Sequence, residues 1–478
     1  MLALIYLIGL GLYFPAIFNF FTHDNFFHLK ISRANSLKEF LGFFSLLKAP
    51  EGWGYYRPLT TQLIYFVETK LFKLNPVALN LLAFLMFFVV IYLVYKLSWL
   101  LTRNKDISLL TTFFYTVSAT HFTHLYYVAD QELGTAIFYF LTIILSIKFL
   151  RTKRKKLYWT SLLTFIGALM SRESAVMIPL ALGLVYGLLK VKLKKMIKIL
   201  VPFLVILMVY GYLHIFYYGL VTGDSYIWNF SLKTALNSWG WYGLWSLNLP
   251  QMLIDYVGPG LKVNPNLMLF WGEEIKIILG LFLSLIILMG INLIITLKKI
   301  NKKIVTELLF SGLWFLGLLL PVIFLPWHKF TIYLTIPLFG VVLGISRLIV
   351  TTNSYLKTIK FSWLIKVNLI LILIVYLLLS FNTLSLTRKT HWVTLGGAIS
   401  RRVYEYFSQL EPQTKNKVGV YFYNQPTDID LPWEANDQLK ITLSGNNFFT
   451  VFFPDKFEWV DDETQANLKL PARQFLGY

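Results

Sequence analysis

Apolar runs long enough to cross a lipid bilayer as helices recur from the start of the chain to about residue 383. A helix of about 20 residues crosses the roughly 30 Å of hydrocarbon and bonds its own backbone N–H and C=O groups without water. The sequence therefore predicts an all-α polytopic membrane protein with about eleven transmembrane helices. The runs lie at 2–21, 77–95, 107–120, 132–149, 158–170, 174–189, 199–220, 275–297, 305–326, 331–350 and 362–383.

Composition agrees with this class. Hydrophobic residues make up 56% of the 478 residues and charged residues only 14%, whereas soluble domains carry about 25% charged residues. The absence of cysteine excludes disulfides, thiolate metal sites and a cysteine nucleophile. The first apolar run lacks a basic leading segment and a small-residue cleavage site, so we expect it to be retained rather than removed as a signal peptide.

The net charge of +20 fits either nucleic-acid binding or membrane orientation, and the placement of the basic residues decides between them. Half of the 44 Lys and Arg residues fall in windows without acidic residues, at 96–105, 148–156, 190–198, 298–303 and 347–366. Such alternating loops are cytoplasmic under the positive-inside rule. We therefore expect membrane lipids and no nucleic acid as partners, in a protein of the prokaryotic cytoplasmic membrane.

This orientation sends three long segments to the outer face, at 22–76, 221–274 and 384–478. The first two belong to a membrane domain at 1–383, and the third forms an extracytoplasmic domain. Residues 57–76 have helically spaced apolar side chains, which predicts an amphipathic helix at the membrane surface. The many aromatic residues of 221–274 fit an interfacial belt, with sugar stacking as the alternative.

The last 95 residues or so have a different pattern. A stretch that ends at Pro412 predicts an amphipathic helix. The stretches "KVGVYFYN", "DQLKITLSG" and "NFFTVFF", at 417–424, 437–445 and 447–453, are rich in residues that favour strands and are separated by turn residues. We therefore expect a small extracytoplasmic α/β appendage with three or four strands.

Ionisable residues gather at the predicted outer ends of the spans. Such groups are costly near a membrane, so each is a functional candidate unless it serves only a structural pairing or is simply solvated. For Arg172 and Glu173 the structural alternative is pairing with each other or with a neighbour. The spacing of His121 and His124 puts two imidazoles on one helical face, but no third ligand indicates a metal site. The candidates are Asp24, Arg57, His121, His124, Asp130, Glu132, Arg172, Glu173, His328 and Lys329.

The order of these motifs resembles the multi-spanning GT-C glycosyltransferases, in particular the branch related to protein O-mannosyltransferases. The resemblance covers roughly residues 1–350. It is carried by an Asp after the first span, "YYRPLTTQLIYFVETKLFKLNPVALN", the His pair before "ADQELGTAIFYFL", "LMSRESAVMIPLAL" and "WHKFTIYLTIPLFG". Many relatives have paired acids where this chain has Asp24 followed by Asn25, which weakens any metal-bridging pair here.

The resemblance implies transfer of a hexosyl or mannosyl group from a polyprenyl-phosphate carrier to a hydroxyl of a protein or glycan at the extracytoplasmic face, with inversion. Asp24 would be the catalytic base. Arg57, Arg172, Lys329 and His328 would bind the donor phosphate, supported by His121, His124, Glu132 and Glu173. Such chemistry needs a base for the acceptor proton and cations for the departing phosphate. No cofactor is implied, and a divalent cation stays an open alternative.

Two other functions fit buried charges in a membrane protein. A transporter or flippase for lipid-linked sugars is one, although the inverted repeats typical of transporters are not evident in this sequence. An inactive scaffold that presents the extracytoplasmic domain is the other.

The charge pattern makes a direct prediction about topology. Reporter fusions at Lys155 and at Pro412 should report opposite sides of the membrane, with Lys155 cytoplasmic and Pro412 outside, because basic loops are retained in the cytoplasm. Activity of both fusions on the same side would overturn this topology and the grouping of the candidate residues.

Overall fold

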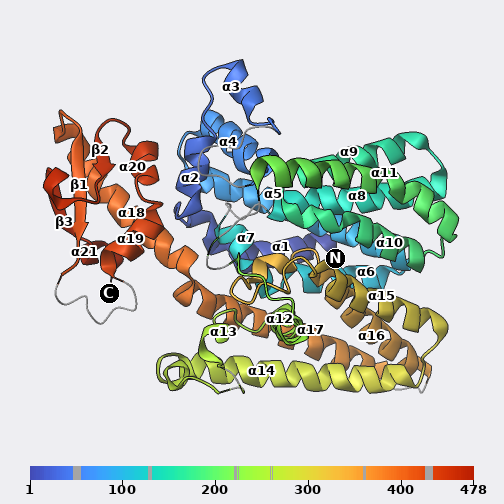
Figure 1. Cartoon of the computed structure of the whole chain (residues 1–478). Coiled ribbons are helices and arrows are strands. Elements are labelled where there is room, and N and C mark those ends of the chain that lie inside the picture. Colours follow the sequence, from blue (N-terminus) through green and yellow to red (C-terminus); the bar gives the residue numbers. More distant parts are fainter. Residues whose placement is uncertain are drawn as a thin grey trace.

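The computed structural model describes residues 1–46, 55–127, 132–219, 223, 226–258, 260, 262–358, 362–425 and 434–477. Figure 1 shows a bundle of long helices with a small domain at one end, built around a three-stranded sheet. Every predicted apolar run contains a helix. These helices are α1 (Leu2–Tyr13), α5 (Pro76–Thr102), α6 (Lys105–Thr116), α8 (Glu132–Thr152), α9 (Lys155–Leu169), α10 (Ile178–Leu188), α11 (Leu193–Leu213), α14 (Pro265–Leu297), α15 (Lys302–Leu318), α16 (Leu338–Thr358) and α17 (Ser362–Thr390).

Six helices among the described residues are long and apolar enough to cross a membrane, namely α5, α8, α11, α14, α16 and α17. They identify the chain as an integral membrane protein. Two shorter apolar helical stretches cover Leu2–Phe18 and Glu173–Leu188. Because α6, α9 and α15 have only 12, 15 and 17 residues, the total of eleven transmembrane helices stays a prediction.

Two predicted runs have different boundaries in the structure. The run at 305–326 is helical only to Leu318, and the run at 331–350 becomes α-helical only at Leu338. Three prolines, Pro321, Pro326 and Pro337, lie in the interval, where proline removes backbone donors and disfavours helix in the residue before it. The interval instead forms turns and a 3₁₀ helix at Thr331–Leu334, and it supplies side chains to the site described below.

Local capping sets the starts of several helices in the bundle. Asn75, Asn104 and Asn301 each precede a helix and accept a hydrogen bond from a backbone N–H in its first turn. Such caps satisfy donors that the helix itself leaves unpaired. Pro76 follows Asn75 at the first position of α5, where its missing N–H costs nothing.

The first predicted outer segment is mostly helical. Its elements are α2 (Asp24–Ile31), α3 (Leu37–Gly42), a π-helical segment η2 (Pro58–Leu63) and α4 (Ile64–Phe72). The helix predicted at 57–76 is confirmed over Pro58–Phe72 as η2 and α4, on which Leu71 and Phe72 are exposed, and its place at the membrane surface stays a prediction. Exposed apolar side chains on a helix that lies at the membrane surface suit contact with lipid.

The second predicted outer segment contains α12 (Leu232–Ser246) and α13 (Leu253–Tyr256). The interfacial belt expected here does not describe all of its aromatic residues. Tyr242 and Trp245 are fully buried in a core with Leu319, Ile323 and Leu334. Trp228 and Phe230 are exposed, as a belt requires.

The carboxy-terminal domain contains the predicted amphipathic helix and a three-stranded sheet. Its elements are α18 (Trp392–Leu410), β1 (Val418–Tyr423), α19 (Ala435–Leu443), α20 (Asn447–Phe452), β2 (Phe457–Trp459), β3 (Leu468–Pro471) and α21 (Arg473–Leu476). The sheet is parallel with the order β2-β1-β3, and Val420 of β1 pairs with Trp459 and with Leu468.

The strands predicted at 437–445 and 447–453 are wrong, because these residues form α19 and α20. Parallel strands need a long crossover connection, and the two helices lie in the connection from β1 to β2. Leu439 and Leu443 are buried at helical spacing in α19, and Phe448, Phe449 and Val451 are buried in α20. Tertiary packing thus overrides the local preference for strand.

Helices α15 and α16 approach closely at Gly340. A Cβ at this position would lie 2.5 Å from the carbonyl oxygen of Ser311 and 3.1 Å from the backbone nitrogen of Phe315. We expect Gly340→Ala to lower the free energy of unfolding by about 1–3 kcal/mol, because backbone atoms cannot give way easily. Denaturant unfolding in detergent measures it. Gly344→Ala in the same helix, with its nearest contact at 3.4 Å, is the matched control and should change stability little.

Candidate active site

Two adjoining cavities lie where several predicted spans end. The Asp24 cavity has a volume of about 270 Å³ and is lined by Asp24, His28, Tyr55, Arg57, Thr123, Tyr127, Arg172, Tyr226, Gln251, His328, Phe330, Ile332, Tyr333, His391 and Trp392. The apolar cavity has a volume of about 370 Å³. It shares five of these residues, which are Tyr55, Arg57, Arg172, Tyr226 and Tyr333. A ligand that touches both arginines therefore has access to both cavities.

Asp24 is the first residue of α2, and its surface is accessible from the Asp24 cavity. Its backbone N–H donates to the hydroxyl of Tyr127 at 3.0 Å. Surrounding protein withdraws the carboxyl from bulk water and so raises its pKa, and this outweighs the opposing effects of a Tyr127 hydrogen bond and of the Arg57 charge. A raised pKa makes the carboxylate a better proton acceptor than an ordinary aspartate.

Asn25 points away from this cavity into the protein. It is only 4% exposed, and its side chain accepts from the N–H of Thr22 at 3.1 Å and donates to the Tyr65 hydroxyl at 2.7 Å. Asn25 therefore stabilises the start of α2 and does not supply a second polar group beside Asp24.

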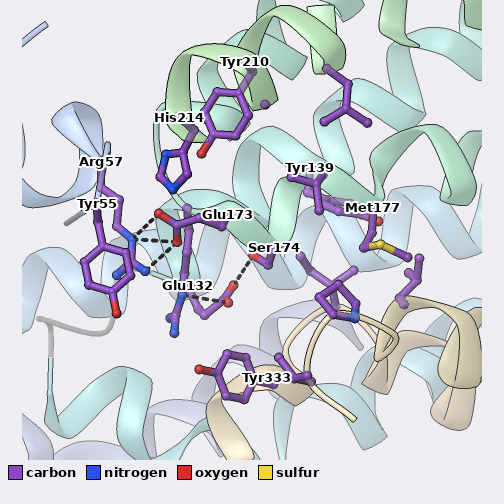
Figure 2. A pocket seen from close by; sticks show the side chains of 18 of the residues that line it. Tyr55, Arg57, Glu132, Tyr139, Glu173, Ser174, Met177, Tyr210, His214 and Tyr333 are labelled. Carbon is purple, nitrogen blue, oxygen red and sulfur yellow. Dashed lines mark hydrogen bonds and ion pairs between the residues drawn. The ribbon is translucent and has the colours of Figure 1, made fainter. Parts of the chain in front are cut away.

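Two ion pairs join the arginines to carboxylates from other segments, and Figure 2 shows the one between Arg57 and Glu173. Arg57 contacts Glu173 through Nε at 2.9 Å and Nη2 at 2.5 Å, and the Nε of Arg172 lies 3.4 Å from Glu132. Arg172 and Glu173 are neighbours in sequence, yet each forms an ion pair with a different part of the chain. The pairs bring together the residue before η2, the start of α8 and the 3₁₀ helix η5 (Glu173–Met177).

Aromatic rings flank both guanidinium groups. Arg57 lies over the ring of Tyr55 at 4.1 Å, and Arg172 lies over that of Tyr333 at 5.4 Å. These contacts, together with the ion pairs, hold the two arginines in place at the boundary of the cavities.

The predicted phosphate-binding residues His328 and Lys329 differ in their placement. His328 lines the Asp24 cavity, and its Nε2 shares a hydrogen bond of 2.7 Å with the Tyr333 hydroxyl. Burial, with the nearby charges of Arg172 and Arg57, lowers the pKa of His328 to about 4, so it is neutral at pH 7. Lys329 lines neither cavity, and its Nζ donates to Asn237 at 2.7 Å.

His121 and His124 are buried in the core and do not line the two cavities. His121 shares a hydrogen bond with the carbonyl of Tyr115 at 2.8 Å, and His124 shares one with the hydroxyl of Thr335 at 2.5 Å. These hydrogen bonds connect the segment 121–124 to Tyr115 and Thr335. Asp130 lies outside the described residues. Within the described ranges, no group of three His, Cys, Asp or Glu side chains is placed to hold a metal ion.

Sequence reasoning missed several lining residues, among them Trp392, His214 and Tyr333. Trp392 lies nine residues after the predicted end of the last span at 383, and only the structure, in which α17 continues to Thr390, places it near a helix end. His214 begins a π-helical turn, η6 (His214–Tyr218), that continues α11 and lines the apolar cavity. Such turns often occur at functional sites, but only the backbone reveals them.

Besides the two glutamates and Tyr139, Ser174, Tyr210, His214 and Trp228, the rest of the apolar cavity is lined mainly by hydrocarbon side chains. They come from η5, α11, the end of α15 and the interval before α16, and they include Val176, Met177, Leu207, Ile215, Leu318, Val322 and Ile336. Only 11% of the most apolar window of α11 is buried inside the protein, so most of this helix is exposed, as expected of a helix that faces lipid. The apolar cavity thus connects a lipid-facing helix with the two arginines. This arrangement suits an amphipathic ligand with an anionic head and a hydrocarbon tail.

No protein-family model matches the chain, and no curated protein matches it in sequence. Among solved structures, the crystal structure of the oligosaccharyltransferase of Archaeoglobus fulgidus, in complex with Zn and sulfate, aligns with a TM-score of 0.46 and 12% sequence identity. The alignment covers 97% of this chain and 62% of that chain. This chain therefore spans less than two thirds of the length of that protein, and a likeness at this level decides neither fold nor function.

The ion pair of Arg57 and Glu173 should couple these residues in folding. We expect Arg57→Met and Glu173→Gln each to destabilise the protein, because either leaves a mostly buried charge without its partner. The double variant should lose less than the sum, by about 1–3 kcal/mol in denaturant unfolding. The exposed pair Glu273–Lys276 is the matched control, for which no measurable coupling is expected. Additive effects at Arg57 and Glu173 would contradict the prediction.

Proposed function

We propose that this protein is an inverting membrane glycosyltransferase that moves a sugar from a polyprenyl-phosphate carrier to a hydroxyl of a protein or glycan acceptor at the extracytoplasmic face. One observation carries the proposal. Asp24 lines one cavity, hydrocarbon side chains from α11 and its neighbours line the adjoining cavity, and Arg57 and Arg172 line both. Under the predicted topology, this site would lie at the extracytoplasmic face of the membrane.

The donor would bind across the two cavities. Its polyprenyl chain would lie in the apolar cavity beside α11, and its phosphate would contact Arg57 and Arg172. Both arginines already pair with glutamates, but a guanidinium has five N–H donors and can contact a carboxylate and a phosphate together. The glutamates would keep the arginines ordered before the donor arrives. His328 would add a neutral hydrogen-bonding group, whereas the position of Lys329 gives it no direct part.

The acceptor would enter the Asp24 cavity. As its hydroxyl oxygen attacks the anomeric carbon, Asp24 takes the hydroxyl proton, and the bond from that carbon to the phosphate oxygen breaks. The two arginines stabilise the negative charge that develops on the departing phosphate. Of the three carboxylates that line the cavities, Glu132 and Glu173 are each held by an arginine. Asp24 is therefore the group placed to accept a proton.

The decisive test uses a panel of radiolabelled polyprenyl-phosphate sugars with purified protein in lipid. We expect transfer by the wild type, and a loss of at least about a hundredfold for Asp24→Asn, which keeps the size of the side chain but cannot take a proton. Donor binding should persist, because Arg57 and Arg172 are unchanged. Transbilayer movement of the donor without transfer would favour a flippase instead.

The pH dependence of the same reaction provides a second readout. The surrounding protein raises the pKa of Asp24, although its side chain is accessible from the cavity, so the base is protonated, and transfer lost, as the pH falls through a value higher than that of an ordinary aspartate. This acidic limb should be missing from the residual activity of Asp24→Asn. Near wild-type transfer by a folded Asp24→Asn protein would remove the base from the mechanism.

A further inference from the structure

The residue before Asp24 has an unusual backbone conformation. His23 has φ 51° and ψ −124°, a region that L side chains rarely adopt and that persists only where the surroundings enforce it. Its N–H donates to the carbonyl oxygen of Thr442, in α19, at 2.7 Å. Its ring shares a hydrogen bond of 2.7 Å with Thr22 and packs edge-to-face on Trp392, with centroids 4.6 Å apart. The turn that starts α2 is therefore hydrogen-bonded to, and packed against, residues of the carboxy-terminal part of the chain.

Helix α18 packs directly against this turn through two adjacent glycines. A Cβ on Gly396 would lie 2.5 Å from the Thr22 hydroxyl oxygen and 2.8 Å from Cε1 of His23. A Cβ on Gly397 would lie 2.9 Å from the side-chain oxygen of Asn19. An added Cβ would force the side chains of Thr22, His23 or Asn19 to move, in the segment that leads into Asp24.

The carboxy-terminal domain also contacts α2 and the residues that follow it. Phe448 of α20 packs edge-to-face on Phe26 at 5.2 Å. Arg33 donates to the carbonyls of Thr450 and Val451, both at 3.1 Å. Figure 1 shows α2 between this domain and the helical bundle.

The bundle holds the opposite side of the same segment. Asn80 of α5 donates to the carbonyl of Asn19 at 2.9 Å, and Asn19 donates to that of Tyr126 at 2.8 Å. The short segment before Asp24 is thus held from both sides, and neither side alone supplies all of its contacts.

We infer that the carboxy-terminal domain positions the catalytic base, with Gly396 and His23 as positioning residues that fix the backbone of Asp24. This inference rests on the proposed function, because it assigns these residues an effect through Asp24. The domain would then affect the reaction through Asp24, although Gly396 touches neither substrate. A displacement of about 1 Å at a reacting group can lower a rate about a hundredfold, so small shifts of this turn matter.

The test compares Gly396→Ala with wild type in the transfer assay. We expect kcat to fall at least about tenfold while the KM for the donor changes less than about twofold, because the two arginines and the apolar cavity are untouched. The matched control is Gly290→Ala in α14, where an added Cβ meets nothing within 4 Å. It should leave both constants unchanged.

A second variant, Arg33→Met, covers the case in which Gly396→Ala does not fold. Arg33 is exposed and lies two residues after the end of α2, and its loss removes two hydrogen bonds to the domain, so a smaller fall in kcat alone is expected. Wild-type kcat in a folded Gly396→Ala protein would overturn the inference, and so would wild-type kcat in Arg33→Met if Gly396→Ala fails to fold.

If Asp24→Asn is inactive while these variants are active, only the positioning inference fails. If Asp24→Asn is fully active, Asp24 is not the base and the positioning inference fails with it, and if the wild type transfers no sugar, the proposed function fails.

Discussion

The pairing of buried charges is the constraint on which the arrangement of the site depends. Arg57 and Arg172 are mostly buried, and a buried charge without a partner is strongly unfavourable. Each arginine therefore requires a carboxylate, and the chain supplies Glu173 and Glu132 from different segments. Because Arg172 and Glu173 are adjacent, the two ion pairs link three segments into one rigid connection. The cavities exist where this connection leaves space between the helices and the proline-rich interval before α16.

The two cavities differ in chemistry because their walls come from different kinds of element. The apolar cavity is lined mainly by hydrocarbon side chains from α11, the end of α15, η5 and the interval before α16. The Asp24 cavity is built by segments between spans and by the start of α18, where polar and aromatic groups can be satisfied. The arginines lie at their common wall. A lipid-linked anion and a polar acceptor could therefore meet without either leaving a suitable environment.

Several features of the fold follow from particular residues in the sequence. Uninterrupted apolar runs produced helices in every predicted case, since no other structure satisfies the backbone in lipid. The amphipathic pattern of 392–410 likewise produced α18. Prediction failed for 437–453, where strand-favouring residues form α19 and α20. Their conformation depends on the parallel sheet and on the packing of Phe448 against Phe26, which are contacts distant in sequence.

For the candidate site, the sequence by itself determined which charged residues stand at the ends of the apolar runs, because each must be near the membrane boundary to be tolerated. This criterion selected Asp24, Arg57, Arg172, Glu132 and Glu173, all of which line the cavities. It could not separate them from Lys329, His121 and His124, which bond elsewhere in the protein. Only the tertiary structure decided that separation, along with the glycine contacts around His23, because burial and hydrogen-bond partners depend on how distant segments pack.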